Sequence, residues 1–338
     1  MYVSVRERVK NRFIKYPNVW NAMQSFKTVM YGYNYLKYYK LPQYKDLSSI
    51  REINIEFCSA CNLRCKFCSL DHLKPKQHLS PEVLEKILIE ISSNRKFSAL
   101  EVINLYNGGE TLLHPKRLEL FKLISKHKKL CLEQGLKFPK VLLLTNGMLL
   151  RKELAQSILE LDVLDVVQFS LDGGTVKKFE DLRTNAKWEK FNKNVLQLIE
   201  LKKSLKSKLQ IKSITIVEEP NPLSTEWMEE EFKQLIEKMD SFELRRLHDW
   251  GGEVHLEPDT QPAKYQLGCN MATHQMVVLP HGPLTLRRTH LTTKGVVGNV
   301  NDNSLGDIYS SKERREYIDK LMWGKRNELE LCKGCQSF

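Results

Sequence analysis

The run Cys61-Asn62-Leu63-Arg64-Cys65-Lys66-Phe67-Cys68 places three cysteines close together in the first quarter of the chain. Three thiolates at this spacing can hold three irons of a four-iron cluster, which leaves the fourth iron without a protein ligand. An iron with an open position can bind and activate another molecule. The spacing therefore indicates a reactive cluster rather than a purely structural one.

Short apolar runs alternate with longer helical patterns from residue 51 onward. The runs typical of strands are 52–57, 100–106, 141–145, 164–171, 210–217 and 243–248. The helical patterns are 81–93, which follows a Ser80 N-cap, and 116–134, 152–161, 187–206 and 225–239. Six such repeats predict a parallel sheet with helices outside it, and an incomplete (β/α) barrel and a doubly wound sheet both fit.

The cysteine run lies where either architecture binds its ligands. Both folds place their sites at the carboxyl ends of the parallel strands. The cysteines follow the first predicted strand directly. We therefore expect them to lie at the carboxyl edge of the sheet.

The alternation stops after Trp250-Gly251-Gly252, where prolines and glycines become frequent. Short strand-like runs at 276–279 and 295–300 precede a predicted helix at 305–322 and the terminal Cys332-Lys333-Gly334-Cys335. This pattern is typical of a small second domain. The sequence thus predicts a basic and aromatic helical extension at 1–50, a catalytic barrel at 51–250 and an auxiliary domain at 251–338.

Composition limits the compartment and the partners. The chain of 338 residues has a formal net charge of +12, eight cysteines and 41% hydrophobic residues. The cysteines are clustered, and the sequence has no apolar run typical of a signal peptide or a membrane span. Together these features predict a metal-binding protein of the cytoplasm. The charge permits acidic partners, but the scattered lysines are also typical of a solubilising surface, and no nucleic-acid motif supports nucleic-acid binding.

Residues 1–50 form an unusual opening segment. Arg6, Arg8, Lys10, Arg12 and Lys15 interleave with apolar residues, and a tyrosine-rich stretch follows up to Pro42. A basic amphipathic helix with aromatic residues can lie on a membrane surface. It can equally pack on its own domain or on a partner, so peripheral membrane contact stays one of two alternatives.

The motifs around the cysteines resemble the radical S-adenosylmethionine (radical SAM) superfamily. Asn62-Leu63 and Phe67 match the positions around its cysteines. Further motifs resembling that family follow at later strand ends, namely Asn107-Gly108-Gly109-Glu110, Leu144-Thr145-Asn146-Gly147, Phe169-Ser170-Leu171-Asp172-Gly173 and Arg183. Several motifs in the right order make this resemblance far more specific than any one of them.

The resemblance implies a partial (β/α)6 TIM-like barrel, with a [4Fe–4S] cluster on Cys61, Cys65 and Cys68 that binds S-adenosylmethionine. It implies glycines that let the backbone approach the methionine moiety, Glu110 at its ammonium group, and Ser170 and Arg183 at ribose and carboxylate. The residues that the resemblance assigns to this cofactor are Phe67, Gly108, Gly109, Glu110, Asn146, Ser170, Asp172 and Arg183. Cys58 and Cys131 are expected to be buried thiols instead.

The C-terminal segment resembles the SPASM/twitch extension of the same family. That resemblance implies an auxiliary iron–sulfur cluster on Cys269, Cys332 and Cys335. Where the family has a further cysteine, this chain has Arg287. Arg287 or a nearby histidine completing the site, an iron open to substrate, a labile or smaller cluster, and no metal at all stay open as alternatives.

Candidate catalytic residues follow the sixth predicted strand. His248 and Asp249 could serve as acid or base and Trp250 could line a pocket. An interdomain hydrogen-bond cluster would explain them equally well. The sequence does not choose between these two interpretations.

The combined reading predicts a radical SAM oxidoreductase that abstracts hydrogen from a substrate C–H bond. We expect a small polar metabolite, such as a sugar or aminocyclitol, and an external electron donor such as flavodoxin or ferredoxin. The first alternative is a peptide-modifying enzyme, although 1–50 is short for the leader-binding domain of that group. The second is a non-catalytic iron–sulfur electron-transfer protein, which would need no S-adenosylmethionine pocket.

Overall fold

The structure is a computed structural model of the whole chain. It describes residues 16–41, 49–93, 97–217, 225–246, 267–286 and 295–333. The predicted basic stretch at 1–15 and Pro42 lie outside these ranges. So do Arg287, Cys335 and the three candidate catalytic residues at 248–250.

Six parallel strands form one continuous curved sheet. They stand side by side in chain order as β1 (Glu52–Ile55), β3 (Val102–Asn104), β4 (Lys140–Thr145), β5 (Val166–Ser170), β7 (Gln210–Val217) and β8 (Ser241–Arg246). Each lies within or next to a run that the sequence predicts as a strand. The partial TIM-like barrel is therefore confirmed.

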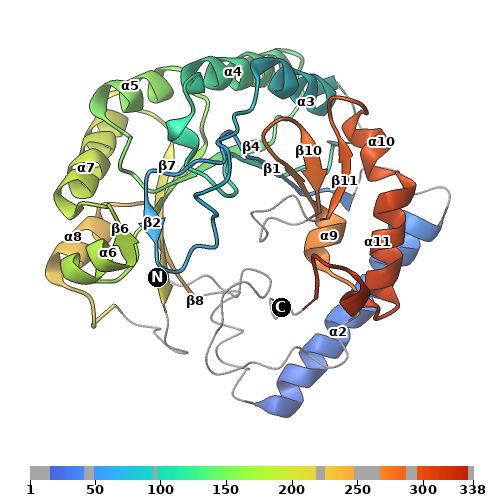
Figure 1. Cartoon of the computed structure of the whole chain (residues 1–338). Helices are drawn as coiled ribbons and strands as arrows, with labels where there is room; N and C mark the ends of the chain where they lie inside the picture. The colour runs from blue at the N-terminus through green and yellow to red at the C-terminus, as the bar shows by residue number, and fades with distance from the viewer. Residues whose placement is uncertain are drawn as a thin grey trace.

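Helices cover the outer side of this sheet (Figure 1). They are α3 (Pro81–Ser93), α4 (Arg117–Glu133), α5 (Lys152–Glu160), α7 (Trp188–Ser204) and α8 (Glu230–Glu237), with the shorter α6 (Val176–Leu182) before α7. All but α6 match predicted helices. The bounds of α3 are those predicted, because Ser80 accepts a hydrogen bond from Val83 N at 3.3 Å and Pro81 suits the first helical position.

The sheet does not stop at the expected domain boundary. Strand β9 (Gln275–Val278) pairs in parallel with β1, and the antiparallel strands β10 (Pro283–Thr285) and β11 (Val296–Asn299) extend the sheet beyond it. The nine strands run in the order β11-β10-β9-β1-β3-β4-β5-β7-β8. The C-terminal segment thus shares a sheet with the barrel.

The C-terminal helices flank this extension. They are α9 (Asn270–His274), α10 (Leu305–Tyr309) and α11 (Lys312–Met322), followed by a 3-10 turn, η6 (Arg326–Glu328). The single helix expected over 305–322 is wrong, because the chain breaks at Ser310 and Ser311. The Ser311 hydroxyl accepts from Arg314 N at 3.2 Å and begins a new helix there.

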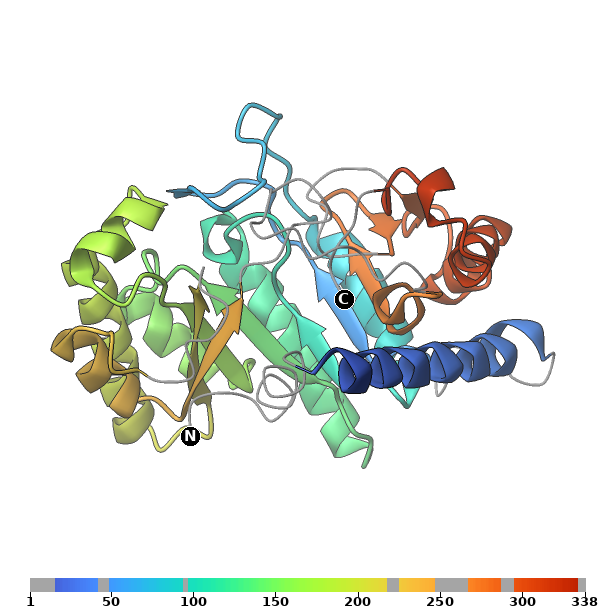
Figure 2. The same ribbon diagram turned by 90° about the horizontal axis from the view of Figure 1, so that it is seen from below.

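The N-terminal segment contributes α2 (Pro17–Tyr35), which continues into one π-helical turn, η1 (Leu36–Lys40). Helix α2 packs against α11, and Figure 2 shows the two next to each other. Tyr31, Tyr35, Tyr38 and Tyr39 are buried. In the described part of the chain, no helix is both long and apolar enough to cross a membrane.

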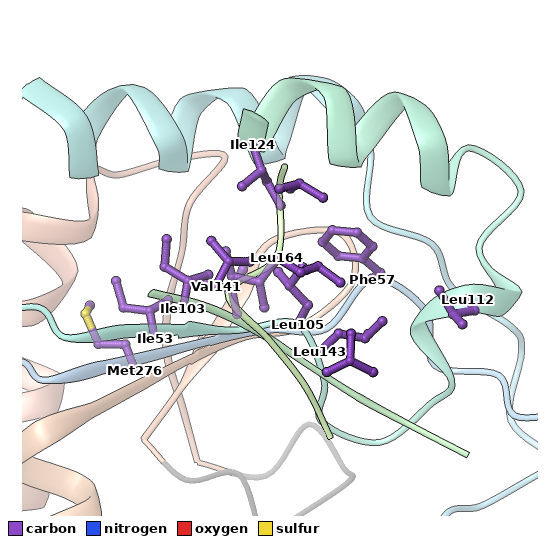
Figure 3. Close-up of a cluster of buried hydrophobic side chains, with 14 of the residues drawn as sticks. Ile53, Phe57, Ile103, Leu105, Leu112, Ile124, Val141, Leu143, Leu164 and Met276 are labelled. Carbon is purple, nitrogen blue, oxygen red and sulfur yellow. The ribbon is translucent and has the colours of Figure 1, made fainter. Parts of the chain in front are cut away.

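The two faces of the sheet differ in chemistry. Residues such as Ile53, Ile103 and Met276 lie on the helix side, fully buried among large apolar side chains (Figure 3). Strand residues alternate between faces, so Glu52 and Asn54 lie on the opposite, concave face. The helix side holds the core, and the concave side carries polar groups.

Candidate functional site

The cysteine run lies in a loop after β1, at the carboxyl edge of the sheet. Cys61, Cys65 and Cys68 are partly exposed, whereas Cys58 is 1% exposed. The Cys58 sulfur accepts a hydrogen bond from Ala60 N at 3.3 Å, which folds the start of the loop. Cys58 is thus a buried thiol as predicted, and so is Cys131 on α4.

A short antiparallel ribbon holds the middle of the loop. It consists of β2 (Arg64–Cys65) and β6 (Arg183–Thr184), in which Cys65 pairs with Arg183. Lys66 N also donates to Leu182 O at 2.9 Å. The Phe67 ring lies 6.0 Å from the Arg183 guanidinium carbon. The cysteine loop is therefore fixed to the segment that follows β5.

Arg183 and Asp172 form a buried ion pair beside the cysteines. Arg183 Nε donates to Asp172 Oδ2 at 2.8 Å, and the two residues are 5% and 1% exposed. The other oxygen, Oδ1, accepts from Ile216 N at 2.7 Å. Since a buried ion needs a partner and further hydrogen bonds, Asp172 fixes the place of the guanidinium.

The glycines of the Asn107-Gly108-Gly109-Glu110 segment lie against the cysteine loop. A Cβ on Gly109 would stand 1.9 Å from Cys58 O and 2.6 Å from Ala60 O. Glu110 N donates to Ala60 O at 2.8 Å. Gly109 is therefore required for backbone packing against the loop, a reason that the sequence does not reveal.

Glu110 ties this segment to the end of β4. Its carboxylate accepts from Leu112 N at 3.1 Å, from the Thr145 hydroxyl at 2.9 Å and from Asn146 N at 2.9 Å. The residue is 3% exposed, and burial raises the pKa of this carboxyl. Three donors leave part of the acceptor capacity of the carboxylate for another group.

Asn146 reaches the first cysteine. Its Nδ2 lies 3.8 Å from the Cys61 sulfur and 3.0 Å from Asn62 Oδ1, while its Oδ1 accepts from Met148 N at 3.0 Å. Ser170, at the end of β5, is half-buried. The structure thus brings Glu110, Asn146, Asp172 and Arg183 around the cysteine loop from four different stretches of sequence.

Sequence reasoning missed Glu56, which follows β1. Its Oε2 accepts from Asn107 Nδ2 at 2.7 Å and from Gly108 N at 3.2 Å. Burial raises the pKa of Glu56 to about 7, and these two hydrogen bonds act in the opposite direction. The sequence feature that could have revealed Glu56 is the alternation of the polar residues Glu52, Asn54 and Glu56 with apolar residues along the first strand.

The three thiols fit an iron–sulfur cluster. Burial raises the pKa of Cys61 to about 12 and also raises the pKa of Cys65 and Cys68, so the thiols stay protonated near neutral pH without a cation. Binding of a metal would displace these protons. Within the described residues no three His, Cys, Asp or Glu side chains converge on a single ion. Three thiols on one short loop suit three corners of a four-iron cluster.

The second cysteine set is described in part. Cys269 occupies the N-cap position of α9, Cys332 follows the 3-10 turn η6, and each is 5% exposed. The two segments are tied together, because Arg326 donates to Gly268 O at 3.0 Å. The Tyr317 hydroxyl lies 3.5 Å from the Cys332 sulfur. Two of the three predicted thiols are thus buried on neighbouring, hydrogen-bonded segments.

These features define a class of protein: a partial (β/α)6 barrel with a three-cysteine loop after its first strand and a cysteine-bearing C-terminal extension. The sequence model of the radical SAM superfamily matches residues 55–217. The model of an iron–sulfur cluster-binding domain, SPASM, matches residues 269–336, so that together they cover more than half of the chain. The chain belongs to the radical SAM superfamily and carries a SPASM domain. These two domains imply a [4Fe–4S] cluster, S-adenosylmethionine and an auxiliary iron–sulfur cluster.

Solved structures share this fold. BtrN, in complex with AdoMet and 2-DOIA, is 19% identical, with 85% of this chain and 93% of that chain covered at a TM-score of 0.57. SuiB of Streptococcus suis, bound to the precursor peptide SuiA, is 15% identical, with 95% and 76% covered at a TM-score of 0.64. Native anSMEcpe with bound AdoMet is 17% identical, with 84% of this chain and 88% of that chain covered at a TM-score of 0.57.

A curated relative matches over a shorter stretch. It is the tungsten-containing aldehyde ferredoxin oxidoreductase cofactor-modifying protein of Pyrococcus furiosus, 30% identical over 124 residues. The match covers 36% of this chain and 31% of the relative. The chain therefore aligns with about a third of the length of that relative.

Proposed function

We propose that this protein is a radical SAM oxidoreductase acting on a small polar metabolite, such as a sugar or an aminocyclitol. Cys61, Cys65 and Cys68 would hold the [4Fe–4S] cluster. When bound, the cluster and S-adenosylmethionine would supply a radical that abstracts hydrogen from an unactivated C–H bond, and the auxiliary cluster would take up the electron left on the substrate. An external donor such as flavodoxin or ferredoxin would supply the electron.

The side chains beside the cysteine loop would bind S-adenosylmethionine. Glu110 would accept from its ammonium group with the acceptor capacity that its three present donors leave. Arg183, oriented by Asp172, would bind its carboxylate, and Ser170 its ribose. Gly108 and Asn146 would border the bound cofactor, with Phe67 beside Arg183.

The proposal of a small polar substrate rests on the polar side chains of the concave face of the sheet. Asn104 Nδ2 donates to Glu52 Oε1 at 2.5 Å and to Asn54 Oδ1 at 2.7 Å. Gln275 Nε2 donates to Glu52 Oε2 at 2.7 Å. Three neighbouring strands, β9, β1 and β3, thus present one connected network of amides and carboxylate.

Two atoms of this network are buried without a hydrogen bond within the described structure, Asn54 Nδ2 and Gln275 Oε1. Asn54 is 0% and Gln275 7% exposed. A buried amide group without a partner is costly, and a hydroxyl or amine of a ligand would satisfy both a donor and an acceptor. A hydroxyl-rich substrate suits this pair.

The opposite wall of the open barrel is charged. On β8, Arg245 donates through Nε and Nη2 to Glu243, both at 3.0 Å. The parallel register places Glu243 beside Ile214 and Arg245 beside Ile216 of β7. Strand β7 in turn places Ile214 beside Ser170. By the alternation of strand residues, this ion pair shares the concave face with Ser170.

A peptide substrate is the second candidate. The observation that favours it is the likeness in fold to peptide-bound SuiB, which extends over 95% of this chain. An open barrel with a polar face could also accept a peptide backbone. The division into 1–50, 51–250 and 251–338 stays a proposal, as do acid–base roles for His248 and Asp249 and a pocket-lining role for Trp250.

The test of the reaction is formation of 5′-deoxyadenosine by the reconstituted, dithionite-reduced protein with S-adenosylmethionine. We expect wild type and Cys131→Ala to form it and Cys65→Ala to form none. Wild-type protein with intact clusters and no product would overturn the enzyme proposal in favour of an electron carrier. Product from Cys65→Ala would show that the cluster is held elsewhere.

The test of the substrate uses the polar network. Polyols, aminocyclitols, sugars and peptides are compared as stimulators of 5′-deoxyadenosine formation. Asn104→Ala should raise the KM for the active polyol or sugar about tenfold or more, since a buried hydrogen bond is lost, while formation without substrate stays unchanged. Glu119→Gln, on the exposed side of α4, is the control. Stimulation by peptides alone would establish the second candidate.

A further inference from the structure

Helix α2 and the π-helical turn η1 that continues it present one face to the C-terminal helices. The Tyr35 hydroxyl donates to Asp319 Oδ1 of α11 at 2.5 Å, and Lys40 pairs with the same carboxylate at 3.2 Å. The Tyr39 ring stacks on Tyr309 with centroids 6.1 Å apart. These contacts fix both the position of α2 and its rotation about its own axis.

The face opposite those contacts is apolar and exposed. Phe26 and Val29 are 66% and 67% exposed and Tyr33 is 57% exposed. Residues spaced three or four apart on a helix share one side. The exposed members form an apolar stripe, namely Val19, Phe26, Val29, Met30, Tyr33 and Leu36. Surface helices normally carry charged and polar residues on the side away from the core, so this stripe indicates a binding face.

The charge of the N-terminal sequence is almost all of one sign. From residue 1 to residue 40 the sequence contains one acidic residue, Glu7. The basic residues of this stretch are Arg6, Arg8, Lys10, Arg12, Lys15, Lys27, Lys37 and Lys40. Lys37 Nζ lies 5.0 Å from the centroid of the Tyr38 ring and 5.9 Å from that of Tyr33, beside the stripe. More than half of the net charge of the protein is thus concentrated in its first forty residues.

We propose that α2 docks the enzyme on an anionic membrane surface. The apolar stripe would enter the interface between headgroups and acyl chains, and the basic residues of this N-terminal sequence would bind anionic lipid headgroups. Tyrosine, as at Tyr33, is enriched at this interface, and phenylalanine, as at Phe26, is typical of the apolar face of interfacial helices. The helix would lie flat on the bilayer, because its other face is fixed to α11.

A bilayer fits better than a second copy of the chain. Two such helices packed through their stripes would bring two strongly basic segments together, with only Glu7 of each to offset the repulsion. Paired helices normally carry complementary charges beside their apolar seam. The charge of this segment is complementary to anionic lipid and not to itself.

Vesicle sedimentation with the reconstituted holoenzyme tests this. Binding to vesicles of phosphatidylcholine is compared with binding to vesicles that also contain phosphatidylglycerol, at low and high salt. We expect at least about tenfold stronger binding to the anionic vesicles, weakened by salt. Phe26→Glu/Val29→Glu should lose this gain while forming 5′-deoxyadenosine at the wild-type rate.

Two further double variants serve as controls for this experiment. Lys10→Glu/Arg12→Glu leaves α2 unchanged and should also weaken binding, which guards against a folding defect in the first variant. Leu73→Glu/Trp323→Glu alters residues that are 96% and 72% exposed elsewhere, and should bind like wild type. Equal binding to neutral and anionic vesicles would overturn the proposal. Loss of a wild-type dimer in Phe26→Glu/Val29→Glu, with no vesicle binding, would assign the stripe to a second copy instead.

Discussion

Cys65 pairs with Arg183 across the ribbon of β2 and β6, so backbone hydrogen bonds place the second cysteine of the loop beside a buried guanidinium. Burial raises the pKa of Cys65, and the charge of Arg183 acts in the opposite direction. The placement of that charge depends on Asp172, which binds Arg183 Nε at 2.8 Å. Asp172 is therefore a positioning residue for both the loop and the arginine.

Asp172→Asn should destabilise the protein by about 3–5 kcal/mol, because it leaves a buried guanidinium without its counter-charge. Asp172→Asn/Arg183→Met should be less destabilised, since the unpaired charge is then gone. Urea unfolding followed by circular dichroism measures both. The exposed pair of Lys66 with Asp181 is the matched control, and Asp181→Asn should cost less than about 1 kcal/mol. Equal losses at the buried and exposed sites would contradict the role of Asp172.

Gly109→Ala should displace the cysteine loop. The new Cβ would lie 1.9 Å from Cys58 O, a backbone atom that cannot rotate away. We expect a loss of about 3 kcal/mol or more in the free energy of unfolding, together with reduced iron incorporation. Gly32→Ala is the matched control, because its Cβ would meet no atom within 4 Å. It should stabilise α2 by up to about 1 kcal/mol. Normal iron content in Gly109→Ala would show that the loop tolerates the shift.

Glu56 should make stability depend on pH. Its pKa is about 7 in the folded protein, against an ordinary value of 4.5, so the folded state binds the proton more tightly. Stability contributed by this group is therefore complete below pH 4.5 and falls as the pH rises to 7, by about 3 kcal/mol in all.

Glu56→Gln keeps an oxygen for Asn107 and Gly108 but cannot ionise. It should leave stability unchanged near pH 4.5 and raise the unfolding free energy by up to about 3 kcal/mol at pH 8. Unfolding of wild type and variant at both pH values is the measurement. A variant that is equally destabilised at both would indicate loss of a hydrogen bond and no titration.

Cys332→Ala/Cys335→Ala should lower the iron content of the protein by the share of the auxiliary cluster, because Cys332 is one of two buried thiols in the described C-terminal segment. The variant should still form 5′-deoxyadenosine without substrate, since the loop at Cys61–Cys68 is untouched. Iron and sulfide analysis beside that assay distinguishes the two sites. An unchanged iron content would show that these two cysteines hold no auxiliary cluster.

The strands and helices of the barrel were predictable because each is specified locally. Helix α3 begins at a serine cap and a proline and keeps one apolar face, so its bounds followed from the sequence. The break between α10 and α11 was missed, because Ser311 can continue a helix or cap one, and the apolar period runs through it.

The pairing of β9 with β1 could not be predicted by local patterns. Gln275 and Glu52 are 223 positions apart, and a parallel pairing over that distance leaves no turn signal. The need for glycine at position 109 could not be predicted either. The atoms that exclude a Cβ there belong to Cys58 and Ala60, about fifty positions earlier in the chain. Asn146 was found through family resemblance, but its contact with the Cys61 sulfur required the fold.

The pairing of β1 with β9 also has a consequence during synthesis of the chain. Strand β1 leaves the ribosome before β9, and one of its edges receives its partner only when β9 follows 223 positions later. At about 5–20 residues per second this takes roughly 11–45 s. Throughout that time the edge of Glu52–Ile55 presents unpaired backbone groups, which makes it a site for mispairing between nascent chains. The polar residues that alternate along β1 would lower that risk, because a charged edge strand is a poor template for aggregation.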